Sequence, residues 1–209
     1  MEPNAVTRML KRTTEETVKE TSVLDNVSTA KPSAGATTQV PSKVTQNPLI
    51  SEHCVDYLNY RIQQEEYSSR VYLAMSMWLN NKGYTGAAGL WRTYSDEELK
   101  HAEWSRTYLL SFGIQPLTPR LDQPAQNFSG LPQIIQDSFD HEVLVSTQCK
   151  QMASESFKKG DHMLYELSLK FLKEQVEEHD KMQTWVDKLE AFGTDKLALR
   201  LLDNEMGEG

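Results

Sequence analysis

The sequence predicts an all-α protein: a four-helix bundle with a long crossover between its second and third helices and a short fifth helix at the C-terminal end. Apolar and aromatic residues recur three and four positions apart in four long segments after residue 48. Short glycine-containing links separate the segments within each half, whereas eighteen residues with three prolines separate the halves. Two helical hairpins joined by a crossover fit this punctuation.

The four segments predict helices at residues 49–81, 86–112, 131–159 and 161–192. The first ends in "NNKGYTG", the third in "KKGD", and the fourth at Gly193, and each of these is a typical helix stop. The short links indicate antiparallel partners, and the long link at 113–130 suits a crossover that joins two parallel neighbours. The amphipathic stretch "TDKLALRLLDNEM" predicts the fifth helix.

The chain divides near residue 48 into a tail and a domain. Residues 1–47 contain no Phe, Trp or Tyr and are rich in Thr and Ser, so we expect a mostly disordered tail, with at most a transient helix at residues 5–20. Residues 48–209 carry the helical periodicity and are expected to form the single domain, which is long enough to bury a core.

Composition excludes several classes of function. The net charge of −8 argues against binding nucleic acid or a membrane surface by bulk electrostatics and is compatible with handling cations. The two cysteines, Cys54 and Cys149, form no CxxC pair, which argues against a disulfide framework and a thiolate metal site. With no long apolar run and no secretory signal, a cytoplasmic protein is expected.

Polar residues interrupt the apolar stripe in the middle of every predicted helix. Steps of three and four along each stripe reach a set of four carboxylates, one imidazole and one amide: Glu65, Glu98, His101, Glu142, Gln175 and Glu178. A buried unpaired carboxylate costs several kcal/mol. The stripes drawn this way contain no Lys or Arg, so the sequence predicts bound metal as the counter-charge, and oxygen donors with one imidazole suit iron.

A single Glu-x-x-His pair is a weak signal, because such pairs arise often by chance and charged helix residues usually face water. The signal becomes specific because polar residues fall on the apolar stripe in all four segments.

The motifs "EEYSSRVYLAMSMW" (65–78), "EELKH" (97–101), "HE" (141–142) and "EQVEE" (174–178) resemble those of the non-haem ferritins of the bacterial type, in the same order. The resemblance covers about residues 49–205. It implies a ferritin-like diiron bundle that assembles into a 24-subunit shell. It also implies that Glu65, Glu98 and His101 hold one iron, and that Glu98 bridges to a second iron held by Glu142 and Glu178 with Gln175 nearby.

The same resemblance implies further roles. Tyr72 matches a tyrosine beside the diiron centre, and Glu97, Glu174 and Glu177 match an accessory third iron site. Haem is not expected, because the positions between Glu98 and His101 lack the methionine of haem-binding relatives, and the fourth helix lacks a second Glu-x-x-His.

The expected function is iron storage and detoxification. The site would oxidise Fe(II) with O2 or H2O2, and the shell would store the product as a ferric mineral. One alternative is a diiron peroxidase or oxygenase of the rubrerythrin type, which predicts the symmetric second Glu-x-x-His that is absent. The other is a DNA-protecting scaffold docked through the tail, which the near-balanced charge of the tail disfavours.

Overall fold

The computed structural model describes residues 49–208, and within that range the secondary structure is five helices and no strand. The helices are α2 (Glu52–Lys82), α3 (Thr85–Ser111), α4 (Leu131–Lys158), α5 (His162–Phe192) and α6 (Lys196–Met206). The predicted all-α class and all five helices are confirmed, with ends within three residues of those expected. The predicted tail at 1–47 and its candidate helix at 5–20 lie outside the described residues.

Local side chains fix several helix ends. The Ser51 hydroxyl accepts a hydrogen bond from the Cys54 N–H at the start of α2, and the Asp161 and Asp195 carboxylates cap α5 and α6 in the same way. Gly83 ends α2 with φ of 86°, a left-handed conformation that other residues rarely adopt. These caps satisfy backbone groups that the helix itself leaves unpaired.

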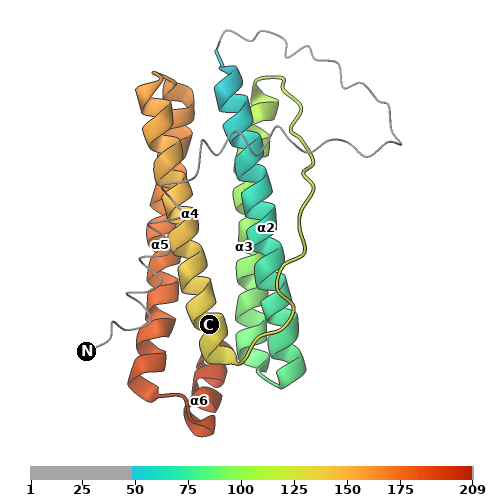
Figure 1. Ribbon diagram of the computed structural model, residues 1–209, viewed down its shortest axis with the longest axis vertical. Helices are drawn as coiled ribbons and strands as arrows, with labels where there is room; N and C mark the ends of the chain where they lie inside the picture. Colours follow the sequence, from blue (N-terminus) through green and yellow to red (C-terminus); the bar gives the residue numbers. More distant parts are fainter. Residues whose placement is uncertain (1–48, 209) are drawn as a thin grey trace, which may run out of the picture. The chain divides into compact units, whose positions relative to one another are not determined.

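The bundle consists of two antiparallel hairpins, α2 with α3 and α4 with α5 (Figure 1). Residues 112–130 run back along the bundle, so that α3 and α4 point in the same direction. Because α2 also contacts α4, and α5 bonds to α3 through Trp185 and Lys181, the order around the bundle is α2, α3, α5, α4. The crossover therefore joins parallel helices as predicted, but they lie diagonally and are not neighbours. Every adjacent pair is antiparallel.

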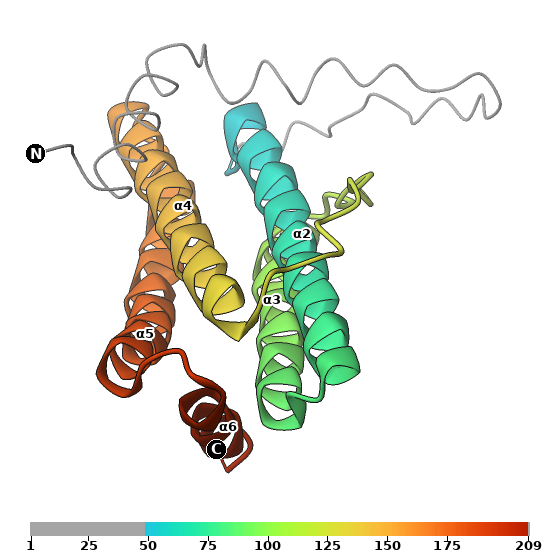
Figure 2. The same cartoon turned by 60° about the horizontal axis from the view of Figure 1, so that its bottom comes forward.

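Helix α6 packs across the end of the bundle against α3 and α5 (Figure 2). Its buried Asp203 accepts a hydrogen bond of 2.9 Å from the Ala87 N–H, which caps the first turn of α3. The approach is so close that a Cβ on Gly86 would lie 1.8 Å from the Asp203 carbonyl oxygen. Any side chain at position 86 would therefore prevent α6 from packing against the start of α3.

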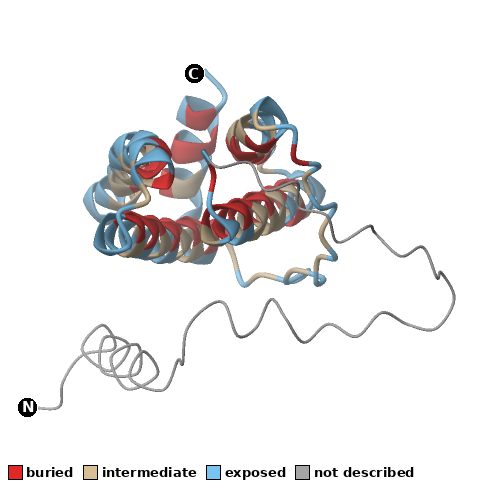
Figure 3. Cartoon of the chain, turned by 90° about the horizontal axis from the view of Figure 1, so that it is seen from above, coloured by how far each residue is buried: buried red, intermediate tan, exposed pale blue. Residues whose placement is uncertain are grey.

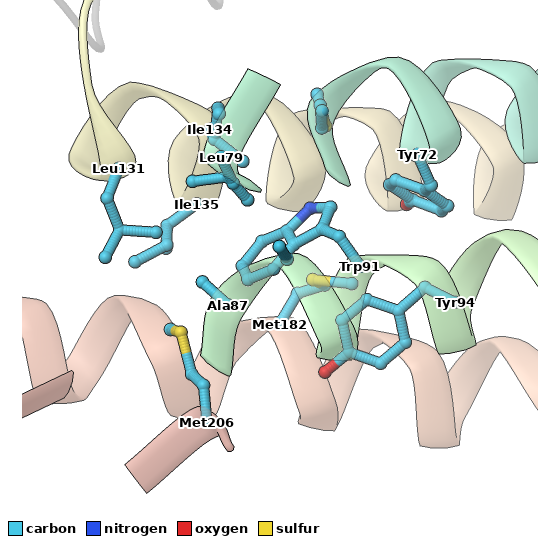
Figure 4. Close-up of a cluster of buried hydrophobic side chains, with 12 residues drawn as sticks. Tyr72, Leu79, Ala87, Trp91, Tyr94, Leu131, Ile134, Ile135, Met182 and Met206 are labelled. Atoms are coloured by element: carbon cyan, nitrogen blue, oxygen red, sulfur yellow. The ribbon is translucent and has the colours of Figure 1, made fainter. Parts of the chain in front are cut away.

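Buried residues line the inward faces of the helices (Figure 3). At the α6 end they form one apolar cluster around Trp91, here called the Trp91 cluster (Figure 4). Its members are Tyr72, Met75, Leu79, Ala87, Ala88, Trp91, Tyr94, Leu131, Ile134, Ile135, Met182 and Met206. Toward the opposite end the buried residues are again apolar, including Leu58, Ile62, Leu109 and Leu164. The predicted polar residues lie between these two apolar regions.

No helix in residues 49–208 combines the length and apolar character needed to cross a membrane.

Candidate metal centre

The middle of the bundle buries polar side chains from all four long helices. Each of the six predicted ligands is buried: Glu65 from α2, Glu98 and His101 from α3, Glu142 from α4, and Gln175 and Glu178 from α5. These polar side chains and the Trp91 cluster therefore lie in the same bundle interior. This burial matches the stripes drawn from the sequence.

Two groups of donor atoms come close enough together to hold a cation. One ligand atom each of Glu65, Glu98 and His101 lie within 4.8 Å of one another, and all three residues are buried. A second group, within the same limit, contains His101, Glu174 and Glu178. The imidazole connects the groups, since its Nδ1 lies 3.1 Å from Glu98 Oε2 and its Nε2 lies 3.6 Å from Glu174 Oε1.

Glu142 and Gln175 lie beside these groups but are hydrogen-bonded to other side chains. The Tyr72 hydroxyl donates to Glu142 Oε1, and Gln175 Nε2 lies 3.3 Å from Glu142 Oε2. The Gln175 carbonyl accepts a hydrogen bond of 2.7 Å from Ser146. The close donor groups therefore do not include Glu142, because its carboxylate oxygens face these two partners.

Burial and mutual repulsion raise the pKa values of the clustered carboxyl groups. Burial raises the pKa of Glu98 well above its ordinary value, and the carboxylates of Glu65 and Glu142 raise it further. Burial likewise raises the pKa of Glu142 to about 7, although the hydrogen bond from Tyr72 opposes the shift. The pKa of Glu178 is also raised by burial, against the effect of Lys181. Protons therefore compete with metal ions for this cluster near neutral pH.

Two cations adjoin the cluster, which corrects the expectation that none is present. Arg61 is 0% exposed and pairs with Glu65 one turn along α2. Its guanidinium also donates to Gln148 at 2.8 Å and lies 5.4 Å from the centre of the Phe171 ring. Lys181 pairs with Glu178 at 3.0 Å.

Each of the four buried carboxylates consequently has a partner within the protein: Arg61 for Glu65, His101 for Glu98, Tyr72 for Glu142 and Lys181 for Glu178. Arg61 and Lys181 thus supply a positive charge to two of the four carboxylates, so bound metal is not the only counter-charge, contrary to the prediction from sequence.

The positions of both cations follow from helix geometry. Arg61 lies three residues after Leu58 and four before Glu65, and Lys181 lies three residues after Glu178. A stripe that steps four residues from Leu58 or from Glu178 reaches Ile62 or Met182 instead and so misses the cation. With 3.6 residues per turn, steps of three and of four both stay on one face, so Arg61 and Lys181 share the face of the carboxylates.

One carboxylate oxygen of the cluster still has no hydrogen-bond partner. Among residues 49–208, Glu65 Oε2 is buried without a hydrogen bond, although Oε1 of the same carboxylate is held by Arg61. An unpaired buried carboxylate oxygen is costly, and a cation shared with Glu98 and His101 would satisfy it. The donor set therefore fits a divalent metal ion at this position.

Comparison with known proteins places the chain in a family. A family model described as Ferritin, ferritin-like domain, matches residues 55–192, well over half of the chain. The chain belongs to the ferritin family.

Several relatives resemble this chain along nearly their whole length. A probable bacterial non-heme ferritin-like protein of Haemophilus influenzae is 29% identical over 159 residues, which are 76% of this chain and 96% of the relative. A bacterial non-heme ferritin of Escherichia coli is 26% identical over 76% of this chain and 96% of its own. Among solved structures, an open-pore ferritin of Archaeoglobus fulgidus superimposes with a TM-score of 0.73 at 28% identity, covering 76% of this chain and 97% of its own. The predicted ferritin-like bundle is confirmed.

Of the three residues predicted for an accessory site, Glu174 alone belongs to a close group of donor atoms in residues 49–208. Glu97 Oε2 lies 3.2 Å from Lys181 Nζ, Glu174 lies next to His101, and Glu177 is exposed. Neither Glu97 nor Glu177 belongs to a close group of donor atoms in the described part of the chain.

The imidazole of His141 lies beside the centre but is not among its candidate ligands. Its Nε2 is hydrogen-bonded to Ser68 at 2.8 Å, and its ring stands edge-on to Tyr72. Burial lowers the pKa of His141 to about 4, so the ring stays neutral and adds no charge to the cluster. The "HE" motif thus supplies one carboxylate of the cluster and one neutral ring that packs against the neighbouring tyrosine.

Proposed function

We propose that this ferritin chain oxidises Fe(II) at the buried carboxylate cluster and stores the iron as a ferric mineral. The observation that carries the proposal is the convergence of Glu65, Glu98 and His101 in the interior of the bundle, with one carboxylate oxygen left unpaired. Oxygen donors with a single imidazole favour ferrous and ferric iron over softer metals. The bacterial relatives are a non-heme ferritin and a probable non-heme ferritin-like protein, which agrees with this chemistry.

In the proposed site Fe(II) is the substrate. Glu65, Glu98 and His101 would hold one ion, and Glu98 would bridge to a second ion held by Glu142 and Glu178. Two ferrous ions then lose one electron each. O2 accepts both electrons with two protons and leaves as hydrogen peroxide, or hydrogen peroxide accepts them with two protons and leaves as two waters.

Neighbouring side chains would orient this ligand set. Tyr72 holds one oxygen of Glu142, and the Gln175 amide holds the other. Gln175 is in turn fixed by Ser146. Because these groups keep the Glu142 carboxylate in one orientation before iron arrives, less ordering is required on binding. An amide at position 175 is also a weaker ligand than a carboxylate or imidazole, which favours release of the oxidised iron.

Storage requires an enclosed volume, and we propose that the chains assemble into a closed shell, of 24 subunits as the sequence resemblance implies. Large apolar side chains are exposed on the isolated chain, among them Leu144, Phe157 and Val176. Contacts between copies would bury such side chains. Sedimentation should give a particle of roughly twenty-four times the 23.9 kDa chain mass. A monomer or dimer at micromolar concentration would contradict the shell.

The test of the reaction is aerobic addition of Fe(II) to purified protein. We expect a rapid rise in ferric absorbance and an iron core that stays with the protein on gel filtration. The double variant Glu98→Ala, His101→Ala should lose the rapid phase. Glu103→Gln is the matched control, because Glu103 lies on the same helix with an exposed carboxylate and should keep it. The proposal is wrong if the wild type oxidises iron no faster than buffer.

A further inference from the structure

Lys181 bridges two helices at the edge of the carboxylate cluster. It lies one turn after Glu178 on α5, and its Nζ is 3.0 Å from Glu178 Oε1 and 3.2 Å from Glu97 Oε2 on α3. Its side chain is 35% exposed, and its ammonium also lies 6.0 Å from the centre of the Tyr94 ring. A single positive charge is thus held between two carboxylates and an aromatic face.

This ammonium pairs with Glu97, one of the residues that the resemblance to bacterial ferritins assigns to a third metal ion. A metal at an accessory site would need the carboxylate of Glu97, and the same oxygen atom faces Lys181. The nearest group of close donor atoms contains His101, Glu174 and Glu178 but not Glu97 or Glu177. Lys181 Nζ lies 3.2 Å from Glu97 Oε2, so a divalent ion bound to Glu97 would lie close to the ammonium, and the two cations would repel each other in this partly buried setting.

We propose that Lys181 takes the place of a third metal ion, so that this ferritin centre is limited to its inner metal positions. The inference rests on the proposed function, which supplies the inner ions. Lys181 is a positioning residue: its ammonium pairs with Oε2 of Glu97 and with Oε1 of Glu178, so that Oε2 of Glu178 is the atom available to an inner ion. Because the ammonium is tethered to α5, it is always at high local concentration and competes with any free cation for the same oxygens.

The proposal is tested by counting metal. The protein is dialysed to equilibrium against a solution of Fe(II) under nitrogen, and the number of bound iron ions per subunit is measured. Lys181→Gln should bind one more ion per subunit than the wild type, whereas Lys181→Arg, which keeps the positive charge, should bind no more. Lys188→Gln is the matched control, since Lys188 lies two turns further along α5, is 31% exposed and pairs with Glu205 away from the cluster.

A second substitution locates the extra ion. Adding Glu97→Gln to Lys181→Gln should return the count to the wild-type value. Thermal unfolding checks that every variant is folded, and Lys181→Met replaces Lys181→Gln if the latter is not. An unchanged count in the folded variant overturns the proposal. The proposal is also overturned if Glu97→Gln alone lowers the iron count by one ion per subunit, because Glu97 would then already bind metal in the wild type.

Failure of the proposed function gives a different result. In that case Glu98→Ala, His101→Ala would leave the wild-type iron count unchanged, because no iron binds at the inner positions. The test of Lys181 uses a different comparison. It asks whether Lys181→Gln binds one ion more than the wild type and whether adding Glu97→Gln removes that ion, and neither result depends on the Glu98→Ala, His101→Ala variant.

Discussion

The Trp91 cluster and the candidate metal centre are neighbouring regions of one interior, and the same four helices build both. In the Trp91 cluster the buried groups are apolar, and the indole of Trp91 satisfies its N–H by donating to Ser138 at 2.9 Å. In the metal centre the buried groups are carboxylates, and each has its own polar partner. Tyr72 belongs to both regions, with its ring in the cluster and its hydroxyl on Glu142.

The difference shows how a bundle can carry a reactive centre without unfolding. Apolar packing on either side supplies the stability, since each large buried side chain contributes a few kcal/mol. The middle contributes little net stability, because even well-paired buried charges barely offset their desolvation. We therefore expect substitutions in the two regions to separate stability from chemistry.

The largest expected loss of stability comes from the apolar region. Trp91→Ala removes a side chain that is 0% exposed and leaves a cavity, and the Ser138 hydroxyl loses the hydrogen bond that it accepts while it keeps the one that it donates to the Ile134 carbonyl. The free energy of unfolding should fall by about 3–5 kcal/mol, measured by urea denaturation of metal-free protein. Iron oxidation below the melting temperature should persist.

Trp185→Ala provides the control for this variant, because Trp185 is only partly buried and packs against the edge of the cluster. Trp185→Ala should lower the free energy of unfolding clearly less than Trp91→Ala does. Equal losses for the two tryptophans would contradict the assignment of Trp91 as the centre of the apolar region.

The next effect is expected at the buried counter-charge. Arg61→Met leaves Glu65 without its cation, which should cost about 3 kcal/mol in metal-free protein at neutral pH. Adding Fe(II) under nitrogen should recover part of the loss. Melting temperatures with and without metal measure both effects.

Arg106→Met is the comparison variant, because Arg106 pairs with Glu66 and Glu103 at a partly exposed site. Arg106→Met should lower the free energy of unfolding of metal-free protein by no more than about 1 kcal/mol. If Arg61→Met loses no more stability than Arg106→Met, the buried pair with Glu65 has no special role.

The helices were predictable from sequence because their signals are local. The spacing of apolar residues and stops such as Gly83 and Gly193 are read from neighbouring positions, and the structure reproduces them. The burial of Glu98 and His101 was also predictable, since apolar residues three and four positions away fixed their face.

The partners of the buried carboxylates were not predictable in the same way. Arg61 shares a face with Glu65, but whether a long side chain turns inward depends on Gln148 and Phe171, which lie on other helices. Likewise, Lys181 reaches Glu97 only because α5 adjoins α3. The length of the crossover indicated parallel helices but not their diagonal placement. Such contacts depend on the packing of segments far apart in sequence.

The smallest effect is a pH dependence confined to the polar region. Glu142 has a pKa of about 7 in the folded chain against an ordinary 4.5, so the folded state binds more protons and becomes less stable as pH rises through 7. The pKa of His141 is lowered, which has the opposite effect, but only below its ordinary value of 6.5. Above pH 6.5 the histidine effect ends, whereas the raised pKa values of Glu98 and Glu178 act in the same direction as that of Glu142. Between pH 6.5 and about 8 metal-free protein should therefore lose on the order of 1 kcal/mol through Glu142, with any loss from the other two carboxyl groups added to it. Glu142→Gln should reduce this slope while Trp91→Ala preserves it, and a slope unchanged by Glu142→Gln would assign the titration to other groups.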